Sequence, residues 1–171
     1  MWRNIAPACT VAVLLASVPA QTKASATVYA IAGAERFAIE RAIAGAARRL
    51  DNAECQRILT DFTDPSGRTL ADILAEAGKT PAEFIRELYW LDDRETACCL
   101  RRGTLAFTMP GQRVIRVCGR RFADVSLSRP IYGDAVFIHE MLHALGLGEN
   151  PPASSDITQR VIARCSGTTR T

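Results

Sequence analysis

The chain is poor in histidine and carries no strong excess of either charge. Only two histidines occur among its 171 residues, and both lie in one short segment. Its 21 lysines and arginines nearly balance its 18 acidic residues. A chain so close to neutral has no electrostatic basis for binding nucleic acid, so we expect no nucleic-acid partner.

The sequence also lacks internal repeats, a long linker and any C-x-x-C pair. The first two absences exclude a repeat architecture and favour one domain. A chain of 171 residues with an apolar content of 48% is sufficient to build one core. The third absence argues against a thiolate zinc site. We therefore expect residues 27–171 to form a single domain.

Residues 1–26 have the features of an export signal. A basic start at Arg3 precedes an apolar run over residues 5–18, and small residues allow cleavage after Ala20 or after Ala26. The alternative is a membrane anchor, but the run is shorter than the ~20 residues that span a bilayer. Cleavage after Ala26 would remove Arg3 and Lys23 and lower the formal charge from +3 to +1. We expect a secreted or periplasmic protein without stable membrane insertion.

Export permits disulfide bonds. The cysteines beyond residue 26 are Cys55, Cys98, Cys99, Cys118 and Cys165. Five cysteines predict two disulfides and one free thiol. A bond between the adjacent Cys98 and Cys99 would strain the peptide between them. We expect Cys55 to pair with Cys98 or Cys99, and Cys118 to pair with Cys165.

Apolar periodicity predicts a mostly helical α+β fold with a small sheet. Helical patterns cover residues 34–50, 55–62, 70–77, 81–91 and 157–165. Thr69 and Thr80 are placed to cap two of these helices, and Glu83 completes a capping box with Thr80. The segment 154–156 is expected to cap the last helix, and Trp90 to lie in the core.

The strand signals lie between the helical patterns. Two short runs, 104–108 and 114–118, flank a Pro-Gly turn at residues 110–111 and predict an antiparallel β-hairpin. A short third strand is expected at 125–127. The hairpin precedes the helix that carries both histidines.

The histidine-bearing helix is predicted to be amphipathic. Pro130 and Gly133 should break the chain before it, and Asp134 should lie at its N-terminus. An apolar arc is expected to face the core on the side opposite the histidines. The arc consists of Phe137, Ile138, Met141, Leu142 and Leu145. The histidine side should then line a cleft.

The segment from residue 139 to 149 reads H-E-x-x-H-x-x-G-x-x-E. Positions i and i+4 of a helix share one face, so His139 and His143 can bind one Zn²⁺. Glu140 lies about 100° further round the helix, where it can take a proton from a zinc-bound water. The alternative is a helix with two incidental histidines and a surface glutamate.

A catalytic zinc site needs a third protein ligand. Glu149 follows a turn at Gly146 that can bring its carboxylate to the metal. Asp156 and Asp134 are alternative ligands, and Glu149 could instead remain a solvated loop carboxylate. We predict Glu149 as the third ligand.

This ligand set predicts a zinc-dependent hydrolase that acts on a peptide or protein. Zinc lowers the pKa of its bound water, and Glu140 accepts the proton and passes it to the leaving amine. Tyr132 is a candidate donor to the oxyanion. The exposed edge of the hairpin could bind an extended peptide by strand addition, which favours peptides over small molecules.

The residues His139-Glu140-x-x-His143 match the helix motif of the zincin metallopeptidases. The extension through Gly146 resembles the metzincin pattern, with Glu149 at the place of the usual third histidine. That resemblance implies a zinc peptidase with a methionine turn below the metal, but no methionine follows Met141. A glutamate as third ligand is similar to the gluzincins. The chain thus resembles a small, divergent exported zincin.

Two other functions are compatible with the same residues. One is a non-catalytic, zinc-stabilised secreted binding protein. The other is a zinc amidase acting on cell-wall peptides, which would share the chemistry of a peptidase.

Arginines cluster around the predicted hairpin. They are Arg101, Arg102, Arg113, Arg116, Arg120 and Arg121. A solvated hairpin edge explains such a cluster, and an anion-binding patch is the alternative.

Overall fold

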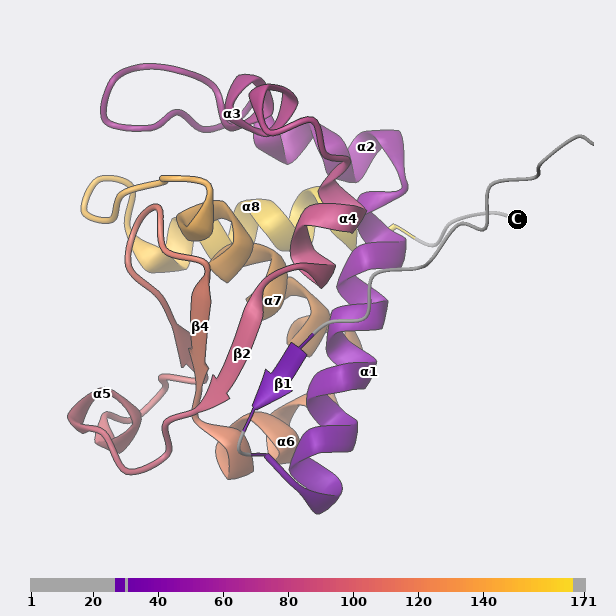
Figure 1. Cartoon of the computed structure of the whole chain (residues 1–171), viewed down its shortest axis with the longest axis vertical. Coiled ribbons are helices and arrows are strands. Elements are labelled where there is room, and N and C mark those ends of the chain that lie inside the picture. The colour runs from indigo at the N-terminus through magenta and orange to yellow at the C-terminus, as the bar shows by residue number, and fades with distance from the viewer. Residues whose placement is uncertain (1–26, 30, 168–171) are drawn as a thin grey trace, which may run out of the picture.

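The computed structural model describes residues 27–29 and 31–167, so the expected export signal lies outside the described residues. The fold is α+β and mostly helical, as predicted, with helices packed behind a small sheet (Figure 1). Within the described ranges, no helix combines the length and the apolarity that crossing a membrane requires.

The predicted helical segments 34–50, 55–62, 70–77 and 157–165 are confirmed with shifted ends, whereas 81–91 is helical only in its first half. The helices are α1 (Gly33–Leu50), α2 (Ala53–Gln56), a 3₁₀ helix η1 (Arg57–Leu59), α3 (Leu70–Glu76), α4 (Pro81–Arg86), α5 (Ala97–Leu100), α6 (Gly119–Ser128), α7 (Pro130–Ala144) and α8 (Ser154–Cys165). Thr69 caps α3, and Thr80 with Glu83 forms the expected capping box of α4. Residues 154–156 form the first turn of α8 rather than a cap before it.

The sheet is mixed. Its strands are β1 (Thr27–Tyr29), β2 (Tyr89–Asp92), β3 (Ala106–Phe107) and β4 (Val114–Val117), in the order β1-β2-β4-β3. The antiparallel pair β3 and β4 confirms the predicted hairpin. The pairs β1–β2 and β2–β4 are parallel, which the sequence did not predict. In β4, Ile115 and Val117 are buried while Val114 and Arg116 are exposed, so one face of the sheet packs on the helices.

The predicted helix over residues 81–91 is wrong in its second half. Helix α4 ends at Arg86, and residues 89–92 form β2. Trp90 is buried as predicted, but it alternates with an exposed Tyr89 in strand fashion. Pairing with β1 on one side and β4 on the other outweighs the local helical pattern, because strand preference depends on neighbours.

The strand predicted at residues 125–127 is also wrong, because these residues belong to α6. In that helix Phe122 and Ser126 are both buried, four residues apart. This spacing is close to the helical period, which the short Val-Ser-Leu segment at 125–127 does not reveal by itself.

Helix α7 begins at Pro130, earlier than expected, because proline suits the first turn of a helix. Gly133 lies inside the helix, where an added Cβ would come within 2.5 Å of Ser126 Oγ on α6. Asp134 does not cap the helix. It is buried against α1, where its Oδ2 accepts a hydrogen bond of 2.9 Å from Arg49 Nε.

An aromatic stack attaches α7 to the rest of the core. The ring of Phe137 lies 4.1 Å from that of Trp90 in β2 and 4.3 Å from that of Phe122 in α6, measured between centroids. The whole predicted apolar arc of α7 is buried. The helix is therefore fixed to the sheet and to α6 at once.

The structure contains two disulfides and one free cysteine among the described residues, as predicted, but the predicted pairing is wrong. Cys55 is bonded to Cys165, and Cys99 to Cys118. Cys98 is free. The first bond joins α2 to the end of α8, and the second joins α5 to the end of β4. Connectivity follows from the packing of these elements, which residue spacing does not reveal.

We predict that Arg49→Ala lowers the free energy of unfolding by about 2–4 kcal/mol, because it leaves Asp134 as a buried carboxylate without its cation. Burial raises the pKa of Asp134, against the opposing effect of Arg49. An acid with a raised folded-state pKa contributes stability at low pH that is lost as the pH rises. The loss should therefore be larger at pH 7 than at pH 4.

Arg48→Ala is the matched control, because Arg48 is exposed on the same turn of α1. Chemical denaturation of both variants at the two pH values is the measurement. Equal destabilisation by the two substitutions would contradict the structural role of the Arg49–Asp134 pair.

Candidate metal centre

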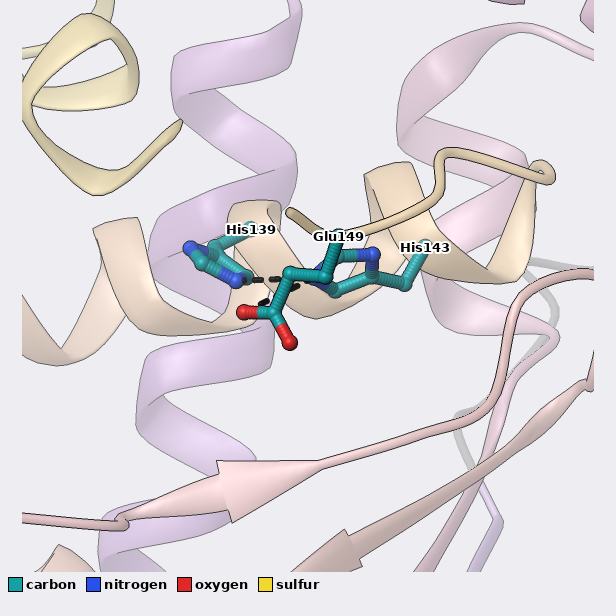
Figure 2. Close-up of side chains that lie close together, drawn as sticks. All are labelled: His139, His143 and Glu149. Atoms are coloured by element: carbon teal, nitrogen blue, oxygen red, sulfur yellow. Dashed lines mark hydrogen bonds and ion pairs between the residues drawn. The ribbon is translucent and has the colours of Figure 1, made fainter. Parts of the chain in front are cut away.

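Helix α7 and the loop after it bring three possible metal ligands together. His139 Nε2 lies 2.9 Å from His143 Nε2, and Glu149 Oε1 lies 4.0 Å from His143 Nε2. One ligand atom from each residue lies within 4.8 Å of the others. Figure 2 shows the carboxylate of Glu149 beside the gap between the two imidazoles. Tetrahedral ligands at about 2.1 Å from a metal are about 3.4 Å apart, so this cluster could hold a metal ion.

Each imidazole is oriented by a partner on its other nitrogen. His143 Nδ1 lies 2.7 Å from the carbonyl oxygen of Leu147. A carbonyl only accepts, so Nδ1 carries the proton and the lone pair of Nε2 faces the cluster. His139 Nδ1 lies 2.9 Å from Thr158 Oγ1 on α8. Outer partners of this kind fix the ring orientation of metal-binding histidines.

The turn after α7 supplies both the Leu147 carbonyl and Glu149. Gly146 has a φ of 112°, a conformation that favours glycine. Its N–H donates to the carbonyl of His143 at 2.8 Å, and the N–H of Leu147 donates to that of Leu142 at 3.1 Å. These two bonds form a Schellman motif, which ends the helix and reverses the chain. The predicted glycine turn is therefore present, and it returns Glu149 to the histidines.

Burial favours the neutral form of His139. His139 and His143 are each only 5% exposed. Burial lowers the pKa of His139 to about 3, and the neighbouring His143 lowers it further. A metal binds the neutral imidazole, so His139 does not have to lose a proton at pH 7 before it can act as a ligand.

Glu140 lies beside the cluster and is also 5% exposed. Burial raises the pKa of Glu140 to about 8, the charge of Glu149 raises it too, and a backbone hydrogen bond from Thr108 opposes them. Its Oε2 is buried and has no hydrogen-bond partner among the described residues. The carboxylate is thus held by the backbone at the end of β3, and one of its oxygens remains unpaired.

A cavity of about 460 Å³ contains these groups. Tyr132, Val136, His139, Glu140 and His143 line it from successive turns of α7. The predicted cleft on the histidine side of the helix is therefore present, although the helix is buried on all sides. The opposite wall includes the strand β3 and the segment before it.

The other candidate residues have different outcomes. Tyr132 lines the cavity, as an oxyanion donor would need to. Asp156 is exposed on α8, where its carboxylate accepts a hydrogen bond of 3.4 Å from Ser155. Neither Asp156 nor Asp134 belongs to the ligand cluster found among the described residues. Of the three alternatives for the third ligand, the structure brings only Glu149 to the histidines.

Two residues that contact the site could not be identified from the sequence. Thr158 contacts His139 from another helix, and Thr108 contacts Glu140 from a strand end. Neither residue belongs to a motif or an apolar period, so neither stands out in its local pattern. The free Cys98 also lines the cavity, which its position beside a bonded cysteine did not reveal.

The site has to be judged on its own geometry. Neither a protein family model, nor a curated protein, nor a solved structure matches the chain. A metal centre is indicated by the ligand spacing, the oriented imidazoles and the buried carboxylate beside them.

We predict that His139→Ala and His143→Ala each abolish stoichiometric metal binding, because each removes one of the three possible ligands that cluster in the described part of the chain. Glu149→Ala should weaken binding at least tenfold. Asp156→Ala is the control and should leave affinity unchanged. Competition titration with Zn²⁺ as the probe measures the metal affinity of all four variants. A larger loss of affinity in Asp156→Ala than in Glu149→Ala would identify Asp156 as the third ligand instead.

We further predict that Thr158→Val weakens Zn²⁺ binding about tenfold, because loss of an outer partner typically costs 10–100-fold in affinity. Thr158→Ser keeps the hydroxyl and should bind like the wild type. Unfolding curves of both metal-free variants separate this effect from a loss of packing. Equal affinities for the two variants would show that the hydroxyl does not orient His139.

Proposed function

We propose that this protein is an exported zinc-dependent metallopeptidase. The observation that carries the proposal is the position of Glu140, which lies in the cavity of the ligand cluster without being one of its ligands. A buried carboxylate oxygen without a partner is costly to the fold. A carboxylate that destabilises the fold and lies beside a possible metal centre supports a chemical role for Glu140.

Zinc fits the donor set. Two imidazole nitrogens and one carboxylate oxygen leave a fourth position open, which is the arrangement of catalytic zinc. His139, His143 and Glu149 would hold the ion. When bound, zinc polarises a carbonyl oxygen and lowers the pKa of water at the open position.

Glu140 would move the proton in this reaction. The charge of a divalent ion beside Glu140 would lower its pKa and keep the carboxylate ionised. The unpaired Oε2 would then accept the proton of the attacking water and give it to the leaving amine. The Thr108 backbone would hold the carboxylate in place meanwhile. Tyr132, which lines the same cavity, would donate a hydrogen bond to the oxyanion.

The strand β3 supports a peptide as the substrate. It is one of the two edge strands of the described sheet, and Ala106, Phe107 and Thr108 line the cavity. An extended peptide could add to this edge through backbone hydrogen bonds. The N–H of Gly111 donates to the carbonyl of His143 at 2.9 Å, which holds the hairpin on α7. A peptide paired with β3 would therefore lie next to Glu140.

The compartment and the resemblance support the same proposal. The two disulfides suit an oxidising environment, and we propose that the protein is secreted or periplasmic. The motif His139-Glu140-x-x-His143 on one helix resembles that of the zincins. With Glu149 as third ligand and no methionine after Met141, the protein would be a divergent zincin.

We predict that Glu140→Gln keeps zinc and lowers kcat for peptide hydrolysis by 10²–10⁴-fold, because an amide cannot accept the proton. The assay uses the oxidised protein from residue 27, with zinc counted in parallel. Glu95→Gln is the control, since Glu95 is exposed outside the metal cavity.

Three other outcomes would change the proposal. Equal activity of the wild type and Glu140→Gln would remove Glu140 from the reaction. Zinc binding without turnover of any peptide would support the zinc-stabilised binding protein. Turnover confined to cell-wall peptides would support the amidase.

A further inference from the structure

The structure divides the arginine cluster around the hairpin into paired and unpaired members. Arg116 Nη1 lies 2.7 Å from Asp93 Oδ2, and Arg113 Nη1 lies 3.7 Å from Glu87 Oε2. Arg101 and Arg102 are exposed, and neither guanidinium has an ion-pair or hydrogen-bond partner among the described residues. Both line the cavity of the candidate metal centre.

The segment that carries the two free guanidinium groups is fixed in place. The disulfide of Cys99 with Cys118 attaches it to the end of β4. Arg121 Nη1 donates to the carbonyl of Arg101 at 2.7 Å and to that of Thr104 at 3.1 Å. The N–H of Cys118 donates to the carbonyl of Leu105 at 2.9 Å. The backbone of this wall is therefore ordered before any ligand binds, which lowers the entropic cost of binding.

The charged side chains of the cavity come from different segments of the chain. Glu140 and Glu149 belong to α7 and the loop after it, where a divalent ion would offset negative charge. Arg101 and Arg102 belong to the segment before β3 and have no acidic partners among the described residues. Guanidinium groups bind carboxylates through paired hydrogen bonds, so this segment matches a negatively charged ligand.

The direction of β3 determines where the two arginines lie relative to the scissile bond of a bound peptide. Glu140 contacts the backbone of Thr108 just after β3, and Thr104 lies two residues before it. Four residues of chain span at most about 14 Å. A peptide that pairs antiparallel to β3 passes from Thr108 toward Thr104, so the residues after its scissile bond approach the two arginines. Antiparallel pairing is the more stable of the two directions.

We propose that Arg101 and Arg102 form a carboxylate-binding subsite that selects an acidic group two to four residues after the scissile bond. The group is either an acidic side chain or the C-terminal carboxylate of the substrate. This inference rests on the proposed function and specifies its substrate class.

The test compares cleavage of synthetic peptides by the zinc-loaded protein. The set carries glutamate or glutamine at each position in turn, with the C-terminus either amidated or free, and mass spectrometry locates the cleaved bonds. We expect about tenfold higher kcat/KM when glutamate or the free terminus follows the cleaved bond, since two partly exposed ion pairs each contribute several-fold. The preference should decrease with salt. The amidated and free-acid arms separate a side-chain carboxylate from a terminal one.

The double variant Arg101→Gln/Arg102→Gln should lose this preference. Arg120→Gln is the matched control, because Arg120 is exposed in the same cluster and does not line the metal cavity. It should keep the preference. A wild-type ratio near one, a ratio retained in the double variant, or a preference for glutamate before the cleaved bond would overturn the proposal.

Failure of the proposed function gives a different result. If no peptide is cleaved, the peptidase proposal fails, and the same peptides are titrated on zinc-loaded Glu140→Gln protein with and without the two arginine substitutions. Tighter binding of acidic peptides that depends on Arg101 and Arg102 supports the subsite. Equal binding of glutamate and glutamine peptides overturns it.

Discussion

The burial of α7 is the constraint on which the rest of the structure depends. Every residue from Gly133 to Ala144 is buried, including charged and polar side chains. The helix therefore needs apolar partners and polar partners on different sides. The stack of Phe137 on Trp90 and Phe122 meets the first need. The second is met on one side by Arg49, which contacts Asp134 at 2.9 Å, and on another side by the partners of the histidines.

The candidate site depends on which buried polar atoms of α7 have hydrogen-bond partners and which do not. Burying a polar group is tolerable when it finds a partner and costly when it does not. Each imidazole uses one nitrogen for a structural hydrogen bond, to Thr158 or to the Leu147 carbonyl. The other nitrogens face each other, and Oε2 of Glu140 is buried without a partner among the described residues. The bonds that orient the imidazoles thus leave their Nε2 atoms directed at the cluster that could hold a metal ion.

The walls around this site are held from outside it. The disulfide of Cys55 with Cys165 ties α8 to α2, and α8 carries the threonine that orients His139. The disulfide of Cys99 with Cys118 ties the arginine-bearing segment to the end of β4. Cross-links of this kind mainly restrict the unfolded chain, but they also limit the movement of the elements that they join. Both walls of the cavity are therefore attached to the core independently of α7.

Local chemistry in the sequence determined most of the longer helices, two threonine caps, the hairpin, and the spacing of His139, Glu140 and His143, because each depends on residues only a few positions apart. It also indicated the turn at Gly146, since few residues besides glycine adopt that conformation readily. The tertiary structure alone decided what depends on distant segments. Parallel pairing made a strand of residues 89–92, and the packing of α8 on α2 chose the partner of Cys55. The packing of α8 on α7 brought Thr158 to His139, because contacts across more than one element leave no periodic trace in a single sequence.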